Sequence, residues 1–414
     1  MRPEVWASCL VYSHAEAELK LNKERIEGVD LKRISMRFIM MMGLVSLFGD
    51  MAYEGARSST GAYMATLGAS AGIVGFVSGF GELIGYVLRI FSGHLADRTK
   101  AYWPLVFLGY GLILSVPLLA LAPSWQVAAI FIISERLGKA IRSPARDAIL
   151  SYATKSVGRG WGFGIHEAMD QIGAISGPLI MSFAMFMGFG FRGGFAFLFV
   201  PAVLVLVVLA VAKSRTPTPE TLETEAREVA QGEGKLPSVY WQYMIFVCLA
   251  VIGLVPFQIM AYHMKIGSLV ADMRIPLYYA LAMGVDAVFA LIVGKLYDSI
   301  GLRTLLLIPV FTLPIPLFAL SRDVMSIALG VGLLGLVMAV HETVMRAAIA
   351  DIVPVQRRGT AYGIFNAAYG ASIFVGSLVI GRLYDISLTH VTLFVLTTVL
   401  LSFFGFIMFL VRKK

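Results

Sequence analysis

The sequence predicts an all-α polytopic membrane protein, with twelve transmembrane helices in two pseudo-symmetric six-helix bundles. Three observations support this fold class. Of the 414 residues, 58% are apolar and only 14% are charged, whereas soluble domains carry about 25% charged residues. Stretches of about 20 mostly apolar residues, the length that crosses a bilayer, occur twelve times. The two halves of the chain also share short repeats.

The twelve apolar stretches set the expected order of helices. They cover residues 35–58, 71–93, 103–122, 125–150, 159–187, 193–213, 239–262, 275–298, 303–320, 324–351, 359–384 and 388–411. A polar segment with three prolines separates the sixth stretch from the seventh and is typical of a soluble linker. We therefore divide the chain into an N-terminal tail or helix (1–34), a first bundle (35–213), a linker (214–238), a second bundle (239–411) and a C-terminal tail (412–414).

The placement of basic residues predicts the orientation of the chain. With the N-terminus in the cytoplasm, 22 of the 34 Lys and Arg residues fall in inner loops and tails, and five fall in outer loops. Cytoplasmic loops carry such an excess of Lys and Arg. We expect a multi-pass, monomeric protein of the plasma (inner) membrane with both termini in the cytoplasm. The charged run before residue 35 is expected to lie outside the bilayer.

Three short blocks recur in both halves, in the same order. Gly93 to Asp97 is similar to Gly294 to Asp298, with an offset of 201 residues. Arg146-Asp-Ala-Ile149 is similar to Arg346-Ala-Ala-Ile349, with an offset of 200. A third block around residues 159–177 recurs at 358–376, with an offset of 199. These matches predict a duplicated six-helix unit, an arrangement that suits alternating access to a site between the halves.

The loop after residue 92 carries a family resemblance. Its sequence, Gly93-His-Leu-Ala-Asp97-Arg98, resembles the first signature of the major facilitator superfamily. The sequence departs from that signature where Lys100-Ala-Tyr follows in place of Gly-Arg and further basic residues. The resemblance covers the chain from about residue 31 to the end. It implies the fold of that superfamily, in which the first, fourth, seventh and tenth helices line a central cavity.

Three weaker features are similar to the drug:proton antiporter branch of that superfamily. The segment Gly173-Ala-Ile-Ser-Gly177-Pro178 matches the start of the antiporter signature, although Met181 and Ser182 stand where the signature ends in Gly-Gly. Arg136 resembles the arginine of the fourth helix, and Asp50 resembles the acidic residue that many antiporters hold in the first helix. The resemblance therefore favours the antiporter branch.

Ionisable residues in the fourth and fifth helices predict a charged cavity, because charges in hydrocarbon usually face a bundle interior or a water-filled space. From the inner face, Lys139 and Arg142 lie at depths of ~16 and ~12 Å, and Glu167 and Asp170 at ~13 and ~18 Å. Arg136, Lys139 and Arg142 share roughly one helix face. Two hypotheses remain: a network that changes partners during transport, or permanent ion pairs that lock the first bundle.

The first helix adds Asp50, Tyr53, Glu54 and Arg57, which also share a face. Asp50 lies nearest the middle of the membrane, and we predict that it binds the coupling proton, because a carboxylate shielded from water holds a proton more readily. The alternative is that Asp50 or Glu54 only neutralises Arg57 or Arg136.

Helices of the second half supply fewer polar residues. Gln258 and Glu342 are expected to line the cavity, whereas His341 is expected to be a satisfied buried histidine. We expect Asp286 to make an interhelical hydrogen bond rather than to bind a ligand. No metal site is expected, because Met345 stands where an HExxH motif needs its second histidine. Cys9 and Cys248 are the only cysteines.

A second group of residues is predicted to form a gate at the cytoplasmic ends of the helices. It comprises Gly93, Asp97, Arg98, Arg146, Asp298 and Arg346. Asp97 would pair with Arg146, and Asp298 with Arg346, when the cytoplasmic side is closed. Alternatively, Asp97 faces the N-terminus of the helix over 359–384, or these charges only anchor helix ends among the lipid headgroups.

The sequence thus predicts a secondary transporter, with proton-coupled efflux of a small organic compound as the first hypothesis. The alternative is proton-coupled uptake or exchange of an anionic metabolite, bound by Arg136, Lys139 and Arg142. No nucleophile–base pair, metal spacing or nucleotide-binding loop indicates an enzyme. The expected partners are the small-molecule substrate, the lipid bilayer and protons, with no nucleic acid and no cofactor beyond a proton gradient.

Overall fold

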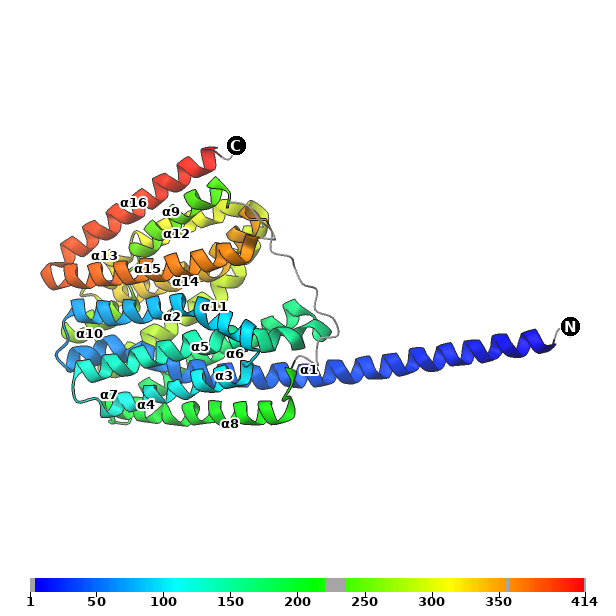
Figure 1. Cartoon of the computed structure of the whole chain (residues 1–414). Coiled ribbons are helices and arrows are strands. Elements are labelled where there is room, and N and C mark those ends of the chain that lie inside the picture. Colours follow the sequence, from blue (N-terminus) through cyan, green and yellow to red (C-terminus); the bar gives the residue numbers. More distant parts are fainter. Residues whose placement is uncertain (1–3, 220–235, 355–356, 413–414) are drawn as a thin grey trace.

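The computed structural model describes residues 4–219, 236–354 and 357–412, and every regular element in these ranges is a helix. The first half forms α1 (Glu4–Thr66), α2 (Ala71–Thr99), α3 (Tyr102–Gly111), α4 (Ser115–Leu118), α5 (Trp125–Val157), α6 (Arg159–Phe186), α7 (Gly190–Phe197) and α8 (Phe199–Arg215). The second half forms α9 (Ser238–Ile252), α10 (Phe257–Ile266), α11 (Ile275–Ile300), α12 (Leu307–Thr312), α13 (Ile315–Ala319), α14 (Val324–Ile352), α15 (Arg358–Ile386) and α16 (Leu388–Arg412). The helices form one bundle, and the N-terminal part of α1 projects from it (Figure 1).

The predicted membrane spans are present as helices. In the described ranges, nine stretches are long and apolar enough to cross a membrane. One of these, residues 272–319, holds two predicted spans, which are separated by a turn at Gly301 with a φ of 61°. The more highly charged helices α5 and α6 lie beside them in the bundle and add two further spans. The predicted fold class is confirmed. The division into domains stays a prediction, and residues 220–235 and 413–414 lie outside the described part of the chain.

The seventh span is broken near its middle. α9 ends at Ile252 and α10 begins at Phe257. Pro256 stands at the break, where its missing N–H and its ring prevent a continuous helix. The first turn of α10 therefore starts inside the bundle, and it brings Phe257 and Gln258 to the wall of the central cavity.

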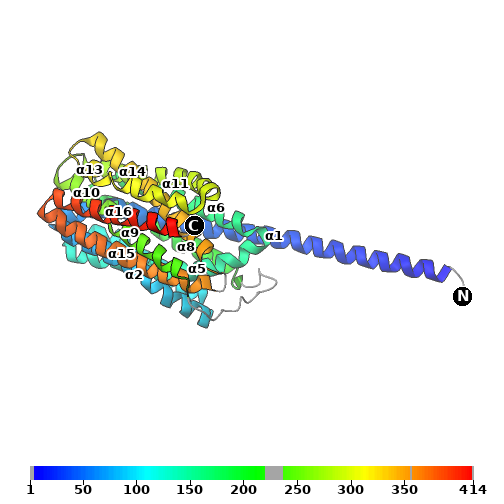
Figure 2. The same cartoon turned by 90° about the horizontal axis from the view of Figure 1, so that it is seen from above.

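The two halves pack closely at the end of the bundle opposite the projecting part of α1, which we call the closed end (Figures 1 and 2). A Cβ atom on Gly75 of α2 would collide with the carbonyl oxygen of Ser377 in α15. A Cβ atom on Gly61 of α1 would likewise collide with the carbonyl oxygen of Gln258 in α10. Small residues permit such close approach of helix backbones, so the closed end is sealed by backbone contacts between the halves.

A carboxylate from the second half also caps a helix of the first half at the closed end. Asp385, near the end of α15, accepts hydrogen bonds from the backbone N–H groups of Ala71 at 2.9 Å and Gly72 at 2.8 Å. These are the first two N–H groups of α2, which have no partner within their own helix. The negative charge also lies at the positive end of the helix dipole. The contact therefore stabilises the closed end.

Candidate functional site

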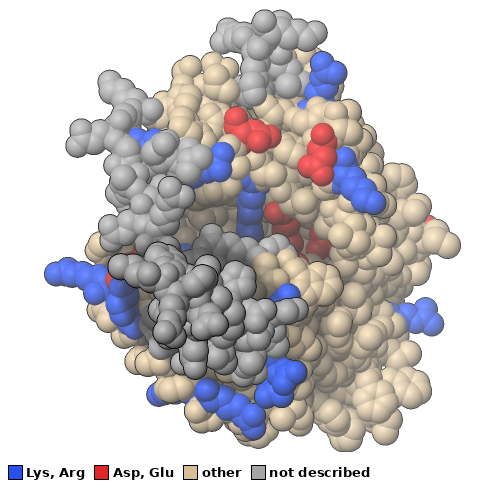
Figure 3. Space-filling view, turned by 90° about the vertical axis from the view of Figure 1, so that its right-hand side faces the viewer, with Lys and Arg blue, Asp and Glu red and all other residues tan. Residues whose placement is uncertain are grey.

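A cavity of about 330 Å³ lies between the two halves and opens at the end from which α1 projects, which we call the open end (Figure 3). Helices α1, α2, α5 and α6 supply one wall, and α10, α11, α14 and α15 supply most of the other. The described residues that line it include eight carboxylates: Asp50, Glu54, Glu82, Asp147, Glu167, Asp170, Asp286 and Glu342. They also include five basic side chains: Arg57, Arg89, Lys139, Arg146 and Arg346.

Most of the residues predicted to face a cavity do line it. They are Asp50, Tyr53, Glu54, Arg57, Lys139, Glu167, Asp170, Gln258 and Glu342. Arg136 lines a small adjoining pocket of about 30 Å³, which shares Tyr53, Arg57 and Gln258 with the main cavity. Arg142 differs from the prediction, because its side chain is only 3% exposed and lies inside the first half.

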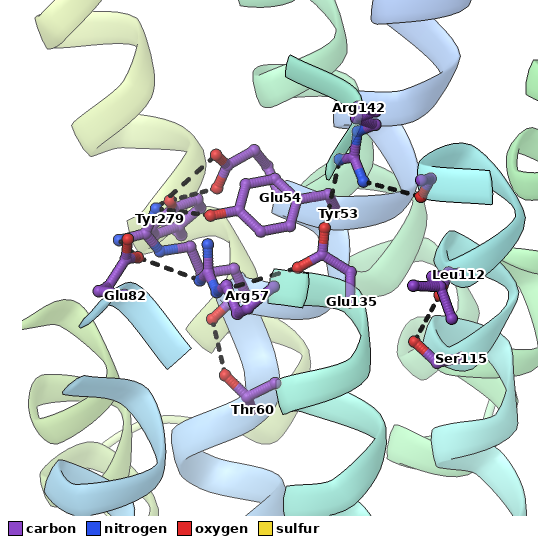
Figure 4. Close-up of polar contacts among 12 residues, drawn as sticks. Tyr53, Glu54, Arg57, Thr60, Glu82, Leu112, Ser115, Glu135, Arg142 and Tyr279 are labelled. Carbon is purple, nitrogen blue, oxygen red and sulfur yellow. Dashed lines mark hydrogen bonds and ion pairs between the residues drawn. The ribbon is translucent and has the colours of Figure 1, made fainter. Parts of the chain in front are cut away.

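Glu82 of α2 links two arginines of the first half. Its carboxylate lies 3.1 Å from the guanidinium of Arg57 and 3.2 Å from that of Arg136. Arg57 also lies 3.8 Å from Glu54. The Tyr279 hydroxyl of α11 donates a 2.6 Å hydrogen bond to Glu54, so this network reaches across to the second half (Figure 4). No role for Glu82 or Tyr279 was predicted from the sequence.

A second acidic residue neutralises Arg142 of α5. Glu135 lies 3.3 Å from Arg142 and 3.9 Å from Arg136. Arg142 also donates a 3.4 Å hydrogen bond to the carbonyl oxygen of Gly109 in α3 (Figure 4). Glu135 precedes Arg136 in the sequence, but only the rotation of α5 reveals that it points into the bundle. These pairs are buried, and a buried charge needs such a partner.

Three cationic side chains lie close to the ring of Tyr53. The Lys139 ammonium lies 3.9 Å from the ring centroid, the Arg136 guanidinium 4.4 Å and the Arg57 guanidinium 5.9 Å. Cations over the face of a tyrosine are attracted by the ring quadrupole. Tyr53 is almost fully buried, so it holds these cations at the wall of the cavity.

The two acids of α6 differ in their surroundings, and Asp170 interacts electrostatically with Arg146 of α5. Asp170 lies 3.5 Å from His166 in its own helix. His166 shares a 2.8 Å hydrogen bond with Ser46 of α1. Glu167 is exposed to the cavity.

The second half places Asp286, His341 and Glu342 on its side of the cavity. His341 shares a 3.1 Å hydrogen bond with the Tyr369 hydroxyl through Nδ1, whereas its Nε2 has no hydrogen-bond partner among the described residues. The expectation of a satisfied histidine is therefore met at one nitrogen only. Glu342 is exposed to the cavity, and Asp286 is buried in the wall.

The predicted gate residues stand apart in this conformation. Gly93, Asp97, Arg98 and Asp298 lie on helix ends at the open end, where the three charged side chains are exposed. Arg146 pairs with Asp147 at 2.9 Å and donates a 2.9 Å hydrogen bond to Ser46. Arg346 lines the cavity. The predicted pairs concern a state with the open end closed, so they stay predictions.

A metal centre finds no support in the described ranges, which contain no group of three or more His, Cys, Asp or Glu side chains that could hold a metal ion. The carboxylates of the cavity are distributed over six helices, α1, α2, α5, α6, α11 and α14. Such a surface suits protons or a small organic molecule that contacts several helices.

A sequence model of the Major Facilitator Superfamily matches residues 36–313 and 275–414, which together extend from the first span to the end of the chain. The chain belongs to this superfamily. It is therefore an integral membrane transporter for a small-molecule substrate.

Relatives and solved structures agree with this assignment. The chain is 37% identical to an uncharacterised protein of Mycobacterium tuberculosis over 372 residues, 88% of this chain and 91% of that protein. It is 28% identical to an uncharacterised MFS-type transporter of Methanocaldococcus jannaschii over 392 residues, covering 91% and 94% of the two chains. It is also 32% identical over 128 residues to the multidrug resistance protein MdtH of Proteus mirabilis, a match that covers 31% of this chain and 32% of that protein.

Among solved structures, the nucleoside transporter NupG superposes with a TM-score of 0.71 at 15% sequence identity, over 90% of this chain and 99% of that chain. A POT family transporter in complex with a thioalcohol-conjugated peptide superposes with a TM-score of 0.72 at 14% identity, over 91% and 96% of the two chains. At these identities the similarity establishes the shared fold alone.

Proposed function

We propose that this transporter exports a small organic compound in exchange for protons, as a monomer of the plasma membrane. The observation that carries the proposal is the acidic character of the cavity. Eight carboxylates and five basic side chains line it among the described residues. A water-filled cavity with more acids than bases attracts protons and cations, and intramembrane carboxylates commonly form proton pathways.

The orientation of the chain follows from the positive-inside rule, which places both termini in the cytoplasm. The open end then faces the cytoplasm, and the structure corresponds to the inward-open state. A substrate would enter from the cytoplasm, the halves would rock about the cavity, and the closed end would open to the outside. Asp50, on the cavity wall near Lys139, is the proposed proton site. The partial similarity to a multidrug resistance protein supports the direction of transport.

The alternative substrate, an anionic metabolite, needs free basic side chains. Glu82 and Glu135 neutralise Arg136 and Arg142, so Lys139 is left as the one residue of that set on the cavity wall. This arrangement weakens the case for an anion site built from Arg136, Lys139 and Arg142.

Transport assays on sealed proteoliposomes test the proposal. We expect a pH gradient to drive movement of ethidium, a cationic dye, and Asp50→Asn to abolish the dependence on the gradient. Asp272→Asn is the matched control, because Asp272 pairs with Lys265 away from the cavity. Movement of ethidium that ignores the gradient would contradict proton coupling. Gradient-driven movement of carboxyfluorescein without ethidium would support the anionic alternative instead.

We also propose that Asp97 pairs with Arg146, and Asp298 with Arg346, when the open end closes. Asp97→Asn should then slow transport and leave the open end accessible to a water-soluble thiol reagent for longer. Lys295→Gln serves as the control, because Lys295 is an exposed charged residue of α11 near the open end. If transport rate and accessibility stay unchanged in Asp97→Asn, this gate must be abandoned.

A further inference from the structure

Three aromatic side chains of the second half pack together at the closed end. They are Tyr262 and His263 of α10 and Tyr384 of α15. The ring of Tyr384 meets those of Tyr262 and His263 edge to face, with centroid distances of 5.6 and 5.8 Å. None of the three lines the central cavity, so the function proposed for the cavity gives this group no role.

The proton on the His263 ring can be placed from its two hydrogen-bond partners. Nε2 lies 3.0 Å from the backbone carbonyl oxygen of Ser321, and a carbonyl oxygen only accepts, so Nε2 carries a proton. Nδ1 lies 2.8 Å from the Tyr384 hydroxyl. In the neutral ring, Nδ1 accepts the hydrogen bond that this hydroxyl donates. Neutral His263 therefore joins α10 to the turn before α14 and to the last turn of α15.

The same turn of α15 also holds the first half. Asp385 follows Tyr384 in the sequence and caps the start of α2 with two hydrogen bonds. Tyr262, the neighbour of His263, interacts with the backbone of Ala71 in α2 and with Asp385. The residues beside the bonded pair, one on α10 and one on α15, thus reach the same end of α2. The hydrogen bond between His263 and Tyr384 fixes the surface on which α2 rests.

The environment of His263 does not favour a charged ring. The residue is only 6% exposed, and the charged residue that acts on it is Arg322, which would repel an imidazolium. A buried charge without a counter-ion is costly. A second proton on the ring would therefore drive it toward water and away from Tyr384.

The acidic residues at this end of the bundle have other partners. Asp272 forms an ion pair, and Asp323 and Asp385 cap α14 and α2. The segments of α1 and α2 beside α10, residues 58–66 and 71–81, contain no charged residue. The other ionisable groups on the packed elements are Tyr262, Lys265, Arg274, Arg382 and Tyr384. These contacts leave the histidine without an acidic partner among the described residues.

We propose that His263 is a proton-operated switch of the closed end. The neutral ring holds Tyr384, and with it the cap that Asp385 places on α2. A proton from the water at this end releases Tyr384, loosens the last turn of α15 and so favours separation of the halves. With the orientation proposed above, acid outside the cell would favour the outward-open state. The switch stands apart from proton-coupled export, because it acts on the seal between the halves and needs no bound solute.

Labelling of a cysteine behind the seal tests the switch in the purified full-length protein. Val74→Cys, with Cys9 and Cys248 replaced by serine, provides the reporter, because Val74 is only 1% exposed within the first turn of α2. The rate of modification by a water-soluble thiol reagent is divided by the rate for His263→Gln at the same pH. Glutamine forms hydrogen bonds but does not titrate, so the ratio removes the pH dependence of the thiol and of the cavity.

The expected response follows from the titration of an exposed histidine. A histidine in water has a pKa of about 6.5. If only the open state takes up the proton, the normalised rate should rise by up to about 30-fold between about pH 7.5 and about pH 5. Tyr384→Phe removes the hydroxyl that the neutral ring holds, so its labelling should be fast already at the higher pH. It is a second test if His263→Gln fails to fold.

His390→Gln is the matched control, because His390 is an exposed histidine at the same end of the bundle, in the first turn of α16. This variant should keep the response of the wild type to acid. A normalised rate that is equal at both pH values, slow labelling of Tyr384→Phe, or loss of the response in His390→Gln would overturn the proposal.

Discussion

The two halves of the molecule differ in how their buried charged residues are paired. In the first half, Glu82 and Glu135 are held by Arg57, Arg136 and Arg142 at distances of 3.1 to 3.9 Å. In the second half, Asp286 has an unsatisfied oxygen, and the described residues show no ion pair within 4 Å for it. Ion pairs that are complete within one half have little affinity left for a ligand. The difference suggests that these ion pairs form a fixed frame within the first half, whereas Asp286 of the second half keeps an oxygen without a partner among the described residues.

The largest expected difference between the halves is in stability. Glu135→Gln should destabilise the protein by about 3–5 kcal/mol, because it leaves Arg142 buried without its partner. Glu342→Gln should change stability by less than about 1 kcal/mol, because this side chain is exposed to the cavity. Thermal unfolding of both variants in the same detergent measures the difference. Equal losses would contradict the distinction between the buried ion pairs of the first half and the cavity-exposed Glu342.

A smaller effect is expected where the halves touch each other inside the cavity. Tyr279→Phe removes the hydrogen bond to Glu54, and hydrogen bonds to charged groups contribute about 1.5–3 kcal/mol. The closed end should then open more often, which cysteine labelling at that end measures as faster modification. Tyr278→Phe is the matched control, because its hydroxyl lies 3.4 Å from the carbonyl oxygen of Val324 within the second half. Unchanged labelling in Tyr279→Phe would show that this contact does not link the halves.

The smallest effect is expected at the cap of α2. Asp385→Asn keeps an oxygen acceptor but removes the charge at the start of the helix, which contributes about 0.3–1 kcal/mol. The same labelling assay should report a modest increase in opening of the closed end. Asp323→Asn alters an equivalent cap at Ser326 within the second half alone, so it should leave labelling unchanged. Identical behaviour of the two variants would remove any special role of Asp385 in holding the halves together.

The span pattern could be predicted from the sequence because it depends on local hydropathy and length. Even α5 and α6, with their charges, were located by the apolar residues that flank them. The depth of each residue along its helix also indicated that Lys139, Glu167 and Asp170 would lie at the cavity. Rotation about the helix axis was harder to predict. Residues three apart turn by about 60° away from a common line, so Arg136 and Arg142 diverge by about 120°, and Arg142 faces into the bundle.

Contacts between polar residues of different helices could not be predicted from their spacing along the chain. Glu82, Tyr279 and Asp385 lie on three different helices, and nothing in the sequence indicates which helix each will meet. The same limit applies to Asp286, for which an interhelical hydrogen bond was predicted. Its side chain does interact with Gln171 of α6, but one oxygen remains without a partner. Only the packed structure distinguishes a completed contact from an incomplete one.

Counting the protons released when a cationic solute binds tests the central claim most directly. Calorimetric titration of the wild-type protein with ethidium, in buffers of different ionisation enthalpy near pH 6, gives this number. The account predicts that binding releases protons, and that release is lost in Asp50→Asn. Ethidium binding with no net proton release in any buffer would contradict exchange of substrate and protons at this carboxylate.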